Sequence, residues 1–344
     1  MSQKTPAELG YRMPPEWHPH AATWLAWPKD PVTWPDRVPA VQEIYLRMIA
    51  LLSAHETVNV LVDDEQTEQS LQRRFLSSTC RERVAFHRVR TVDAWIRDYG
   101  PNFLLGPDGA LAYNKWIFNA WGNKYDELKK DNDVAFRLQA LASIRRFEPG
   151  IVLEGGSIEV DGAGVCITSE QCLLNPNRNR HLSRDEIEQR LKSYLGVEEI
   201  LWLGEGISGD DTDGHVDDIA RFAGPGLIVC ALEDDPQDPN YRPLEDNYRR
   251  LLKATSASGK PYQIVKLPMP RAFTEKGERL PASYANFYIA NGLVLVPLFS
   301  HPNDEKALDI LRKVFPDRSV TGLNCEPLVW GMGTLHCVTQ QQPR

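Results

Sequence analysis

Four predicted strand pairs recur at similar intervals along this chain of 344 residues. Each pair consists of two apolar segments separated by a turn signal such as Pro107-Asp108-Gly109 or Asn291-Gly292. The predicted pairs cover residues 102–113, 157–167, 219–231 and 285–297. A polar residue precedes each of the four pairs, and a fifth polar residue lies near the end of the sequence: Asp98, Glu154, His215, Ser283 and Cys337. Successive members of this series are 56, 61, 68 and 54 residues apart. Repetition at this spacing is typical of a fold that closes a ring of similar units around a central axis.

Helical periodicity between the strand pairs makes the repeating unit a mixed α/β one. Apolar residues from Val38 to Leu52 recur at helical spacing, and Ser183 with Glu186 has the spacing of a capping box. The predicted helices cover residues 38–54, 65–77, 127–146, 184–195, 241–256 and 304–315. This periodicity leaves a doubly wound α/β sheet as an alternative to the ring. Because Gly and Pro are spread evenly and no low-complexity linker interrupts the chain, we expect a single domain over residues 1–344.

The composition indicates a globular protein and argues against several kinds of partner. A net charge of −8 without a dense Lys/Arg stripe argues against nucleic acid. No apolar run approaches the length that crosses a bilayer, so we expect no membrane association. The six cysteines are too few and too scattered for a disulfide scaffold or a zinc site, and residues 1–10 lack the apolar core of a secretion signal. We therefore expect a cytoplasmic protein with reduced thiols and with no metal or organic cofactor.

Three short strings that lie far apart in the sequence combine residues with catalytic potential: Trp95-Ile96-Arg97-Asp98, Gly214-His215-Val216-Asp217 and His336-Cys337. They supply a thiol nucleophile, a histidine that can transfer a proton near neutral pH, and carboxylates suited to binding a cation. If residues 216–219 are extended, His215 and Asp217 point to the same face. Together these residues predict a cysteine enzyme that acts on a planar cation such as a guanidinium.

Each of these residues also fits an ordinary structural role when it is considered alone. Asp98 stands before Gly100-Pro101 and Glu154 before Gly155-Gly156, where either could be a turn residue. Cys337 could be a buried structural thiol, the role that we assign to the other five cysteines: Cys80, Cys166, Cys172, Cys230 and Cys325. The combination, rather than any single residue, favours the catalytic interpretation.

The three strings resemble the agmatine deiminase branch of the guanidine-modifying (pentein) superfamily, which includes bacterial agmatine deiminases and Porphyromonas-type peptidylarginine deiminases. Further matches follow in order along nearly the whole chain, at residues 13–17, 24–28, 154–157 and 340–343. The resemblance implies a five-bladed α/β propeller (pentein fold), one catalytic domain with the active site on the axis. It implies that Cys337 is the nucleophile and His215 the acid/base, that Asp98 and Asp217 hold the guanidinium, and that Glu154 orients the histidine.

The resemblance also implies a substrate and the residues that would contact it. The expected reaction is hydrolysis of agmatine to N-carbamoylputrescine and ammonia through a covalent thiouronium on the cysteine, a step of polyamine biosynthesis toward putrescine. Trp95 matches a wall of the substrate site, Trp121 lies in another family string, and Asp211 stands where an acid often binds the agmatine ammonium. The family further implies a small cationic guanidine as the partner and a homodimer. Peptidylarginine or free arginine is the alternative substrate.

The chain departs from the family pattern at several positions near these strings. Met332, Thr334 and Leu335 replace residues of a Gly-Gly-Gly-Asn-Ile string before His336-Cys337. Asp213 replaces a frequent asparagine, Asp211 is shorter than the usual glutamate, and Glu159 stands where histidine is common: these changes concern the substrate tail more than the chemistry.

Three other functions are compatible with parts of the pattern. Amidino transfer would use the same residues, with an amine in place of water in the second step. A papain-type hydrolase would need a cysteine, a histidine and one orienting residue, but would leave the additional carboxylates unexplained. A propeller that only binds proteins would carry an unreactive Cys337 and show no preference for guanidines.

Overall fold

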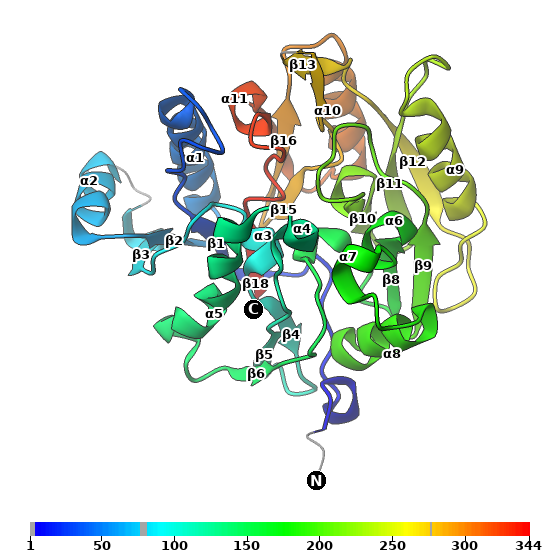
Figure 1. Ribbon diagram of the computed structural model, residues 1–344, viewed down its shortest axis with the longest axis horizontal. Helices are drawn as coiled ribbons and strands as arrows, with labels where there is room; N and C mark the ends of the chain where they lie inside the picture. The colour runs from blue at the N-terminus through cyan, green and yellow to red at the C-terminus, as the bar shows by residue number, and fades with distance from the viewer. Residues whose placement is uncertain (1–3, 76–80, 276) are drawn as a thin grey trace.

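The computed structural model describes residues 4–75, 81–275 and 277–344 (Figure 1). Cys80 and the last two residues of the helix predicted over 65–77 lie outside the described residues. The strands are β1 (His20–Ala26), β2 (Thr57–Val62), β3 (Val84–Arg88), β4 (Asn102–Leu105), β5 (Leu111–Asn114), β6 (Arg145–Phe147), β7 (Glu159–Val160), β8 (Val165–Ser169), β9 (Glu199–Leu203), β10 (Ala220–Gly224), β11 (Leu227–Leu232), β12 (Gln263–Pro268), β13 (Phe273–Glu275), β14 (Glu278–Leu280), β15 (Tyr288–Ala290), β16 (Leu293–Leu298), β17 (Ser319–Asn324) and β18 (Gln340–Pro343).

The strands form small separate sheets that share one plan. In the sheets β4-β5-β6, β7-β8-β9, β10-β11-β12 and β15-β16-β17, the first two strands are antiparallel and the third is parallel to the second. These antiparallel pairs are the four pairs that the sequence predicts. The sheet β18-β1-β2-β3 follows the same plan with one further parallel strand, and β13 pairs with β14 in a short hairpin. The strands therefore do not form the single sheet of a doubly wound fold.

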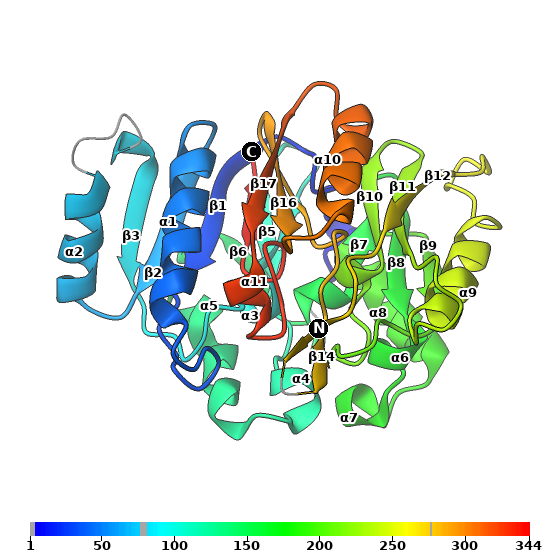
Figure 2. The same ribbon diagram turned by 90° about the horizontal axis from the view of Figure 1, so that it is seen from above.

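The last strand of the chain completes the first sheet. Strand β18 pairs antiparallel with β1, from His20 opposite Pro343 to Trp24 opposite Gln340. Figure 1 shows the sheets arranged around a common centre, near which α3 (Ile96–Tyr99) and α4 (Ala120–Asn123) lie. Figure 2 shows the C-terminus beside β1. Pairing between the two ends of the chain joins the first unit to the last.

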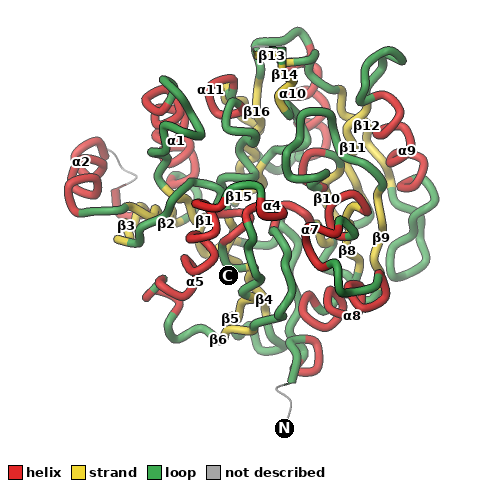
Figure 3. The backbone as a smooth tube through the Cα atoms, viewed as in Figure 1, coloured by secondary structure: helices red, strands yellow, loops and turns green. Residues whose placement is uncertain are grey.

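The longer helices lie at the periphery, whereas loops and short helical turns occupy the centre (Figure 3). Four predicted helices are confirmed, with observed starts within three residues and observed ends within five residues of the predicted ones: α1 (Val38–Ser53), α8 (Arg184–Leu195), α9 (Tyr241–Leu251) and α10 (Asn303–Val314). The helix α2 (Glu65–Phe75) confirms the described part of a fifth prediction. The short helices and 3-10 turns are η1 (Ala7–Leu9), η2 (Arg81–Arg83), η3 (Asp126–Asp133), α5 (Val134–Arg137), η4 (Gln139–Leu141), η5 (Gly155–Ser157), α6 (Glu170–Leu173), α7 (Pro176–Asn179), η6 (Val216–Asp218) and α11 (Glu326–Val329).

The prediction of one helix over residues 127–146 is wrong. The segment instead contains η3, α5 and η4, and it ends in β6, which pairs parallel with β5. The side chain of Asp131 accepts hydrogen bonds from the backbone N–H groups of Val92 and Asp93, and Asn132 accepts one from Phe118. These bonds to other segments fix the local backbone, so tertiary contacts override the helical periodicity.

The apolar face of each sheet is buried in one of two clusters. The larger cluster includes β1, β2, β11 and β16 with the inner faces of α1, α9 and α10, and the smaller one includes Leu104, Ile158, Ile187 and Leu191. Both clusters surround the central loops and hold them between packed sheets. Within the described residues, no helix combines the length and the apolar character needed to cross a membrane.

The capping box that begins α8 gives a direct test of the local fold. Ser183 accepts a hydrogen bond from the backbone of Glu186, whose carboxylate accepts one from the backbone of Ser183. Replacing Ser183 by Ala should lower the free energy of unfolding by about 0.5–2 kcal/mol, measured by urea denaturation. Ser193→Ala, on the same helix but away from its start, is the matched control and should change it by less than about 0.5 kcal/mol. Equal effects of the two substitutions would contradict the capping role.

Candidate active site

A cavity of about 670 Å³ opens at the centre of the molecule and leads to Cys337. Its deep end is formed by Cys337 before β18, Trp95 and Asp98 before β4, and Trp121 in α4 between β5 and β6. Its mouth is lined by apolar and acidic residues, among them Val32, Tyr125, Trp330, Met332, Asp30, Asp126, Glu127 and Asp211. The cavity therefore places a thiol and a carboxylate at the bottom of an acidic entrance.

Cys337 lies in the loop between α11 and β18, with 8% of its surface exposed. Asn286 Nδ2 donates a hydrogen bond to the sulfur at 3.1 Å, and the thiol points to Asp217 Oδ2 at 3.6 Å. Burial raises the pKa of Cys337 well above its usual value, and the charges of Asp217, Asp218 and Asp98 raise it further. The thiol is therefore protonated at neutral pH while the cavity holds no cation.

Gly333 is required for the close packing above the sulfur. A Cβ atom at this position would lie 2.7 Å from the ring of Trp95 and 3.1 Å from Cys337 Sγ. Residue 333 therefore has to lack a side chain if Trp95 and the thiol are to share one wall of the cavity. Trp95 is buried and fixed by a hydrogen bond from Nε1 to Asp93 Oδ2 at 2.9 Å.

His215, Asp98 and Asp217 converge on the backbone of Gly156. A Cβ atom on Gly156 would lie 2.6 Å from His215 Nδ1, 3.0 Å from Asp98 Oδ1 and 3.1 Å from Asp217 Oδ2. The Gly156 N–H donates a hydrogen bond to Asp98 Oδ1 at 2.9 Å, and His215 Nδ1 lies 3.8 Å from the same oxygen. The structure thus brings together three of the residues that the sequence selects, at a position where a glycine is needed.

Residues 216–219 are not extended, but His215 and Asp217 still face the same side, as the sequence predicts. Residues Val216–Asp218 form the 3-10 turn η6. Asp210 fixes the approach to this turn, because its Oδ2 accepts hydrogen bonds from the N–H groups of Gly214 and His215. His215 and Asp217 still face the same cluster, since the turn closes around Gly156.

Burial disfavours the charged form of His215, but neighbouring negative groups outweigh it. The charges of Asp98 and Glu154, together with a hydrogen bond to Cys172, hold the pKa of His215 well above its usual value. In contrast, burial raises the pKa of Asp98, and the His215 charge opposes this only in part. A protonated histidine beside carboxylates can serve as the acid that protonates a leaving group.

Glu154 lies behind His215 and is paired with a second cation. Its Oε1 accepts a hydrogen bond from Arg178 Nε at 2.7 Å, and both side chains are buried. Donor atoms of Glu154, Cys172 and His215 lie within 4.8 Å of one another, which is close enough for them to share a metal ion. The positive charge of Arg178 at Glu154 disfavours a cation there. The arrangement fits a role in orienting His215.

Trp121 contacts the site through a backbone conformation that the sequence does not reveal. Its Nε1 donates a hydrogen bond to Asp98 Oδ2 at 2.9 Å. Four successive residues have left-handed backbone angles, with φ of 55°, 51°, 85° and 65°: Ala120, Trp121, Gly122 and Asn123. Three of these are not glycine, so this turn stores backbone strain at the point where Trp121 fixes Asp98.

Asp211 lies at the mouth of the cavity rather than near the thiol. The hydroxyl of Tyr125 donates a hydrogen bond to Asp211 Oδ2 at 2.6 Å, and burial raises the pKa of Asp211 to about 6. Its neighbour Asp213 points away from the cavity lining and pairs with Lys124 and Arg178, each at 2.7 Å. Only Asp211 of these two acids is therefore available to a substrate.

Sequence reasoning missed Asn286, which connects the loop of Cys337 to the start of β15. Its Oδ1 accepts hydrogen bonds from Thr334 Oγ1 at 2.7 Å and from the N–H of His336 at 3.0 Å, while its Nδ2 contacts the sulfur. The polar position Ser283 had marked this segment, but Ser283 itself donates to the backbone of Asp218. His336 and Glu16 were also missed as individual residues, although both lie within strings that carry the resemblance.

Comparisons with known proteins agree with this geometry. A family model for Porphyromonas-type peptidyl-arginine deiminase matches residues 12–343. The chain is 38% identical to an agmatine deiminase of Stutzerimonas stutzeri, over 98% of this chain and 97% of that protein. It is similar to the structure of an Enterococcus faecalis agmatine deiminase, with a TM-score of 0.92, 36% identity and coverage of 100% and 99%. It is also similar to a C. jejuni agmatine deiminase solved with substrate bound, with a TM-score of 0.86, 32% identity and coverage of 97% and 96%.

The charge of Asp217 should control the reactivity of the thiol. Asp217→Asn removes a negative charge beside Cys337, which lowers the pKa of the thiol and should raise its alkylation by iodoacetamide severalfold at pH 7.5. Mass spectrometry of the Cys337 peptide measures this rate without interference from the other cysteines. Glu127→Gln, which removes an exposed acid from the cavity mouth, is the control and should leave the rate unchanged. Slower alkylation of Asp217→Asn would contradict the proposed charge effect.

Proposed function

We infer that this chain, which belongs to the Porphyromonas-type peptidyl-arginine deiminase family, is a hydrolase that converts agmatine and water into N-carbamoylputrescine and ammonia. The observation that carries the inference is the convergence of His215, Asp98 and Asp217 on one point beside the Cys337 thiol. A protonated histidine, two carboxylates and a sulfur in one buried cluster match the needs of a planar cation that loses an amine.

We propose that the five larger sheets are the blades of a five-bladed α/β propeller and that residues 1–344 form one catalytic domain. The shared strand plan and the pairing of β18 with β1 support a closed ring. The candidate site lies where the loops before β4, β7, β10 and β18 meet, which is the position of the axis in such a ring.

In the first half of the proposed reaction, the guanidinium binds between Asp98 and Asp217. Each carboxylate can accept N–H bonds from the planar cation. The bound positive charge offsets the negative field that keeps Cys337 protonated, so the thiol releases its proton to solvent through the cavity and the thiolate attacks the guanidinium carbon. His215 then protonates one amino group, the carbon–nitrogen bond breaks, and ammonia leaves a thiouronium bound to Cys337.

In the second half, the neutral His215 takes a proton from a water molecule, which attacks the thiouronium carbon. The carbon–sulfur bond breaks, the proton of the carbon-bound hydroxyl group passes to the sulfur, and the ureido product leaves with the Cys337 thiol regenerated. Glu154 supports both halves through its charge, which lies close to His215 and raises the pKa of the ring, and Trp95 forms the wall against which the planar group lies. No step requires a metal ion or an organic cofactor.

The lining of the cavity favours agmatine over free arginine. Its described lining residues include six acids and no lysine or arginine. The carboxylate of free arginine would meet this negative entrance without a partner, whereas the ammonium of agmatine could bind Asp211. A peptidyl substrate carries no such carboxylate next to the side chain, so it is the second candidate.

We also propose that the protein acts in the cytoplasm, in polyamine biosynthesis. The described cysteines are free thiols, as a reducing compartment favours: Cys166, Cys172, Cys230, Cys325 and Cys337. The homodimer implied by the family stays a prediction.

A substrate panel tests the reaction. Purified protein should form ureido product and ammonia from agmatine without any added amine, and it should act far more slowly on free arginine and on a blocked arginyl peptide. Cys337→Ser should fold normally but lose turnover, while Cys325→Ala, at a buried cysteine away from the cavity, should keep it. Product from the peptide alone would overturn the substrate, and dependence on an added amine would indicate amidino transfer. Near-full activity of Cys337→Ser would refute the mechanism.

The role of Asp211 predicts a selective loss and a pH dependence. Asp211→Asn should raise the KM for agmatine about 10- to 100-fold, but it should leave kcat/KM for butylguanidine, which lacks the ammonium, nearly unchanged. In the unmodified protein, the preference for agmatine over butylguanidine should fall as the pH drops through about 6, because Asp211 becomes neutral there. Asp126→Asn, at the same cavity mouth, is the control. Equal losses for both substrates would show that Asp211 does not bind the tail.

A further inference from the structure

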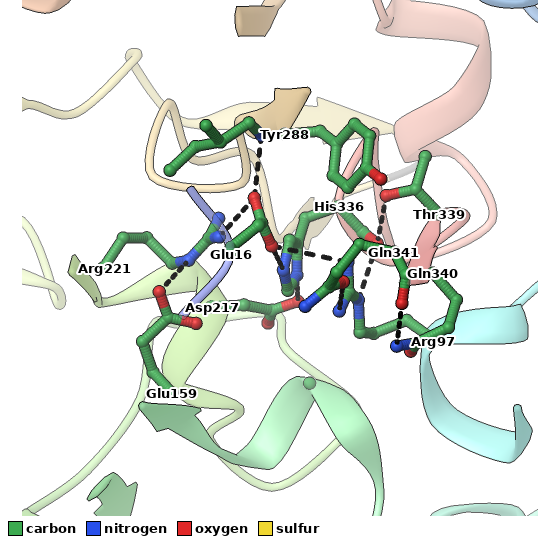
Figure 4. Close-up of polar contacts among 12 residues, drawn as sticks. Glu16, Arg97, Glu159, Asp217, Arg221, Tyr288, His336, Thr339, Gln340 and Gln341 are labelled. Carbon is green, nitrogen blue, oxygen red and sulfur yellow. Dashed lines mark hydrogen bonds and ion pairs between the residues drawn. The ribbon is translucent and has the colours of Figure 1, made fainter. Parts of the chain in front are cut away.

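A second histidine lies next to the nucleophile and takes no part in the proposed proton transfers. His336 is 1% exposed, does not line the cavity, and lies between two carboxylates (Figure 4). Its Nδ1 lies 2.7 Å from Asp217 Oδ2, and its Nε2 lies 2.8 Å from Glu16 Oε2. Both ring nitrogens are thus within hydrogen-bonding distance of a carboxylate oxygen.

This geometry defines the protonation state of His336. An ionised carboxylate only accepts hydrogen bonds, so each nitrogen that faces one must carry a proton. The ring is therefore an imidazolium as long as Glu16 and Asp217 are ionised. His336 shares this buried network with two arginines, Arg97 and Arg221, and with a third carboxylate, that of Glu159.

Glu16 is fixed by contacts that do not involve the cavity. Its Oε1 lies 2.9 Å from Arg221 Nη2 and accepts the N–H of Ile289 at 2.7 Å, and its Oε2 lies 3.5 Å from Arg97 Nη2. Burial opposes ionisation of Glu16, but the charges of Arg221, His336 and Arg97 outweigh it and lower the pKa of Glu16. The N-terminal segment thus places an ionised carboxylate, that of Glu16, beside His336.

The orientation and the pKa of Asp217 depend on this pairing of His336 with Glu16. The same oxygen that binds His336 also faces the Cys337 thiol and the open position beside Gly156. Burial alone would raise the pKa of Asp217, but the hydrogen bond and the charge of His336 reverse the shift and lower it. The other charged or titratable groups that face Asp217 are His215, Arg221, Asp98, Asp218 and Cys337.

We propose that His336 is a positioning residue, an imidazolium that is fixed by Glu16 and that holds Asp217 ionised and oriented toward the guanidinium. This inference rests on the proposed function for the identity of the bound cation. The two histidines of the site then have different roles, proton transfer for His215 and positioning for His336. His215, whose Nδ1 lies 3.8 Å from Asp98, can exchange a proton, whereas His336 is held at both nitrogens and cannot.

The charge state of His336 can be measured without any substrate. In protein labelled with ¹⁵N-histidine, the His336 signals are assigned by their loss in His336→Gln. Two protonated ring nitrogens from pH 6 to pH 9 are expected. A single N–H at His336 at neutral pH would overturn the inference, whatever the substrate of the enzyme.

The positioning role is tested by kinetics with agmatine across the pH range. His336→Gln should lower kcat/KM about 10- to 100-fold, and it should move the acid limb of the profile to higher pH by about one unit or more, because Asp217 loses its cation. The sign follows from the lowered pKa of Asp217: activity that needs the carboxylate persists to low pH only while His336 is present. Glu16→Gln should cause a smaller change in the same direction, and the double variant should lose less than the sum of the two.

A matched control separates this role from loss of packing. His20→Gln removes another buried histidine that pairs with a glutamate, Glu56 at 3.1 Å, away from the cavity. It should lower the thermal midpoint as much as His336→Gln does but leave kcat/KM and the acid limb unchanged. If His336→Gln and Glu16→Gln lower only the thermal midpoint, the inference is wrong. A protein that shows the doubly protonated ring but deiminates no guanidine would refute the proposed function and the guanidinium role, but not the charge state.

Discussion

The central constraint on this structure is the burial of several carboxylates around one sulfur atom. Asp98, Asp217 and Asp218 lie together in an interior where like charges repel strongly and where each charge loses its hydration. His336, Arg221 and the protonated His215 compensate this cluster, whereas the described lining of the cavity contains no lysine or arginine. The free site therefore has a preformed cavity but carries an excess of negative charge. In the proposed mechanism a guanidinium supplies the missing positive charge, and by doing so it also offsets the field that keeps Cys337 protonated. Binding and activation of the nucleophile are in this way the same electrostatic event.

The fold provides this cluster by repeating one structural plan. In each of the five larger sheets of the described residues, the antiparallel strand pair is preceded by a segment that reaches the centre. Each segment contributes a polar residue there: Asp98 before β4, Glu154 before β7, His215 before β10, Asn286 before β15 and Cys337 before β18. Packed sheets hold the loops on all sides, so residues more than 200 positions apart can meet within hydrogen-bonding distance. The close approach of the carboxylates and the thiol also requires glycine at two positions, Gly156 and Gly333, because a side chain there would clash with these groups.

The sequence predicts the repeating units well, because their signals are local. Turn residues and helical periodicity identify the strand pairs and the peripheral helices, and the capping box at Ser183 is found as predicted. The helix expected over 127–146 fails because Asp131 and Asn132 bond to distant backbone groups, which no local pattern records. The same limit applies at the site. Cys337, His215 and Asp217 stand out as residue types, but the left-handed turn at Trp121 and the pairing of His336 with Glu16 depend on contacts across the whole chain.

The departures from the family pattern follow the same division between scaffold and cavity. Glu159 is a buried counter-ion of Arg221, Thr334 bonds Asn286, and Asp213 pairs with Arg178, so each of these residues has a partner within the protein. A polar residue that is buried with its partner contributes to the scaffold, and a change at such a position can be compensated by the partner without altering the reaction. Met332 and Asp211 differ from the others because both line the mouth of the cavity. In the proposed mechanism the bottom of the cavity holds the planar group and the mouth holds the rest of the substrate, so variation at these two positions should act on the tail and leave the chemistry at Cys337 unchanged.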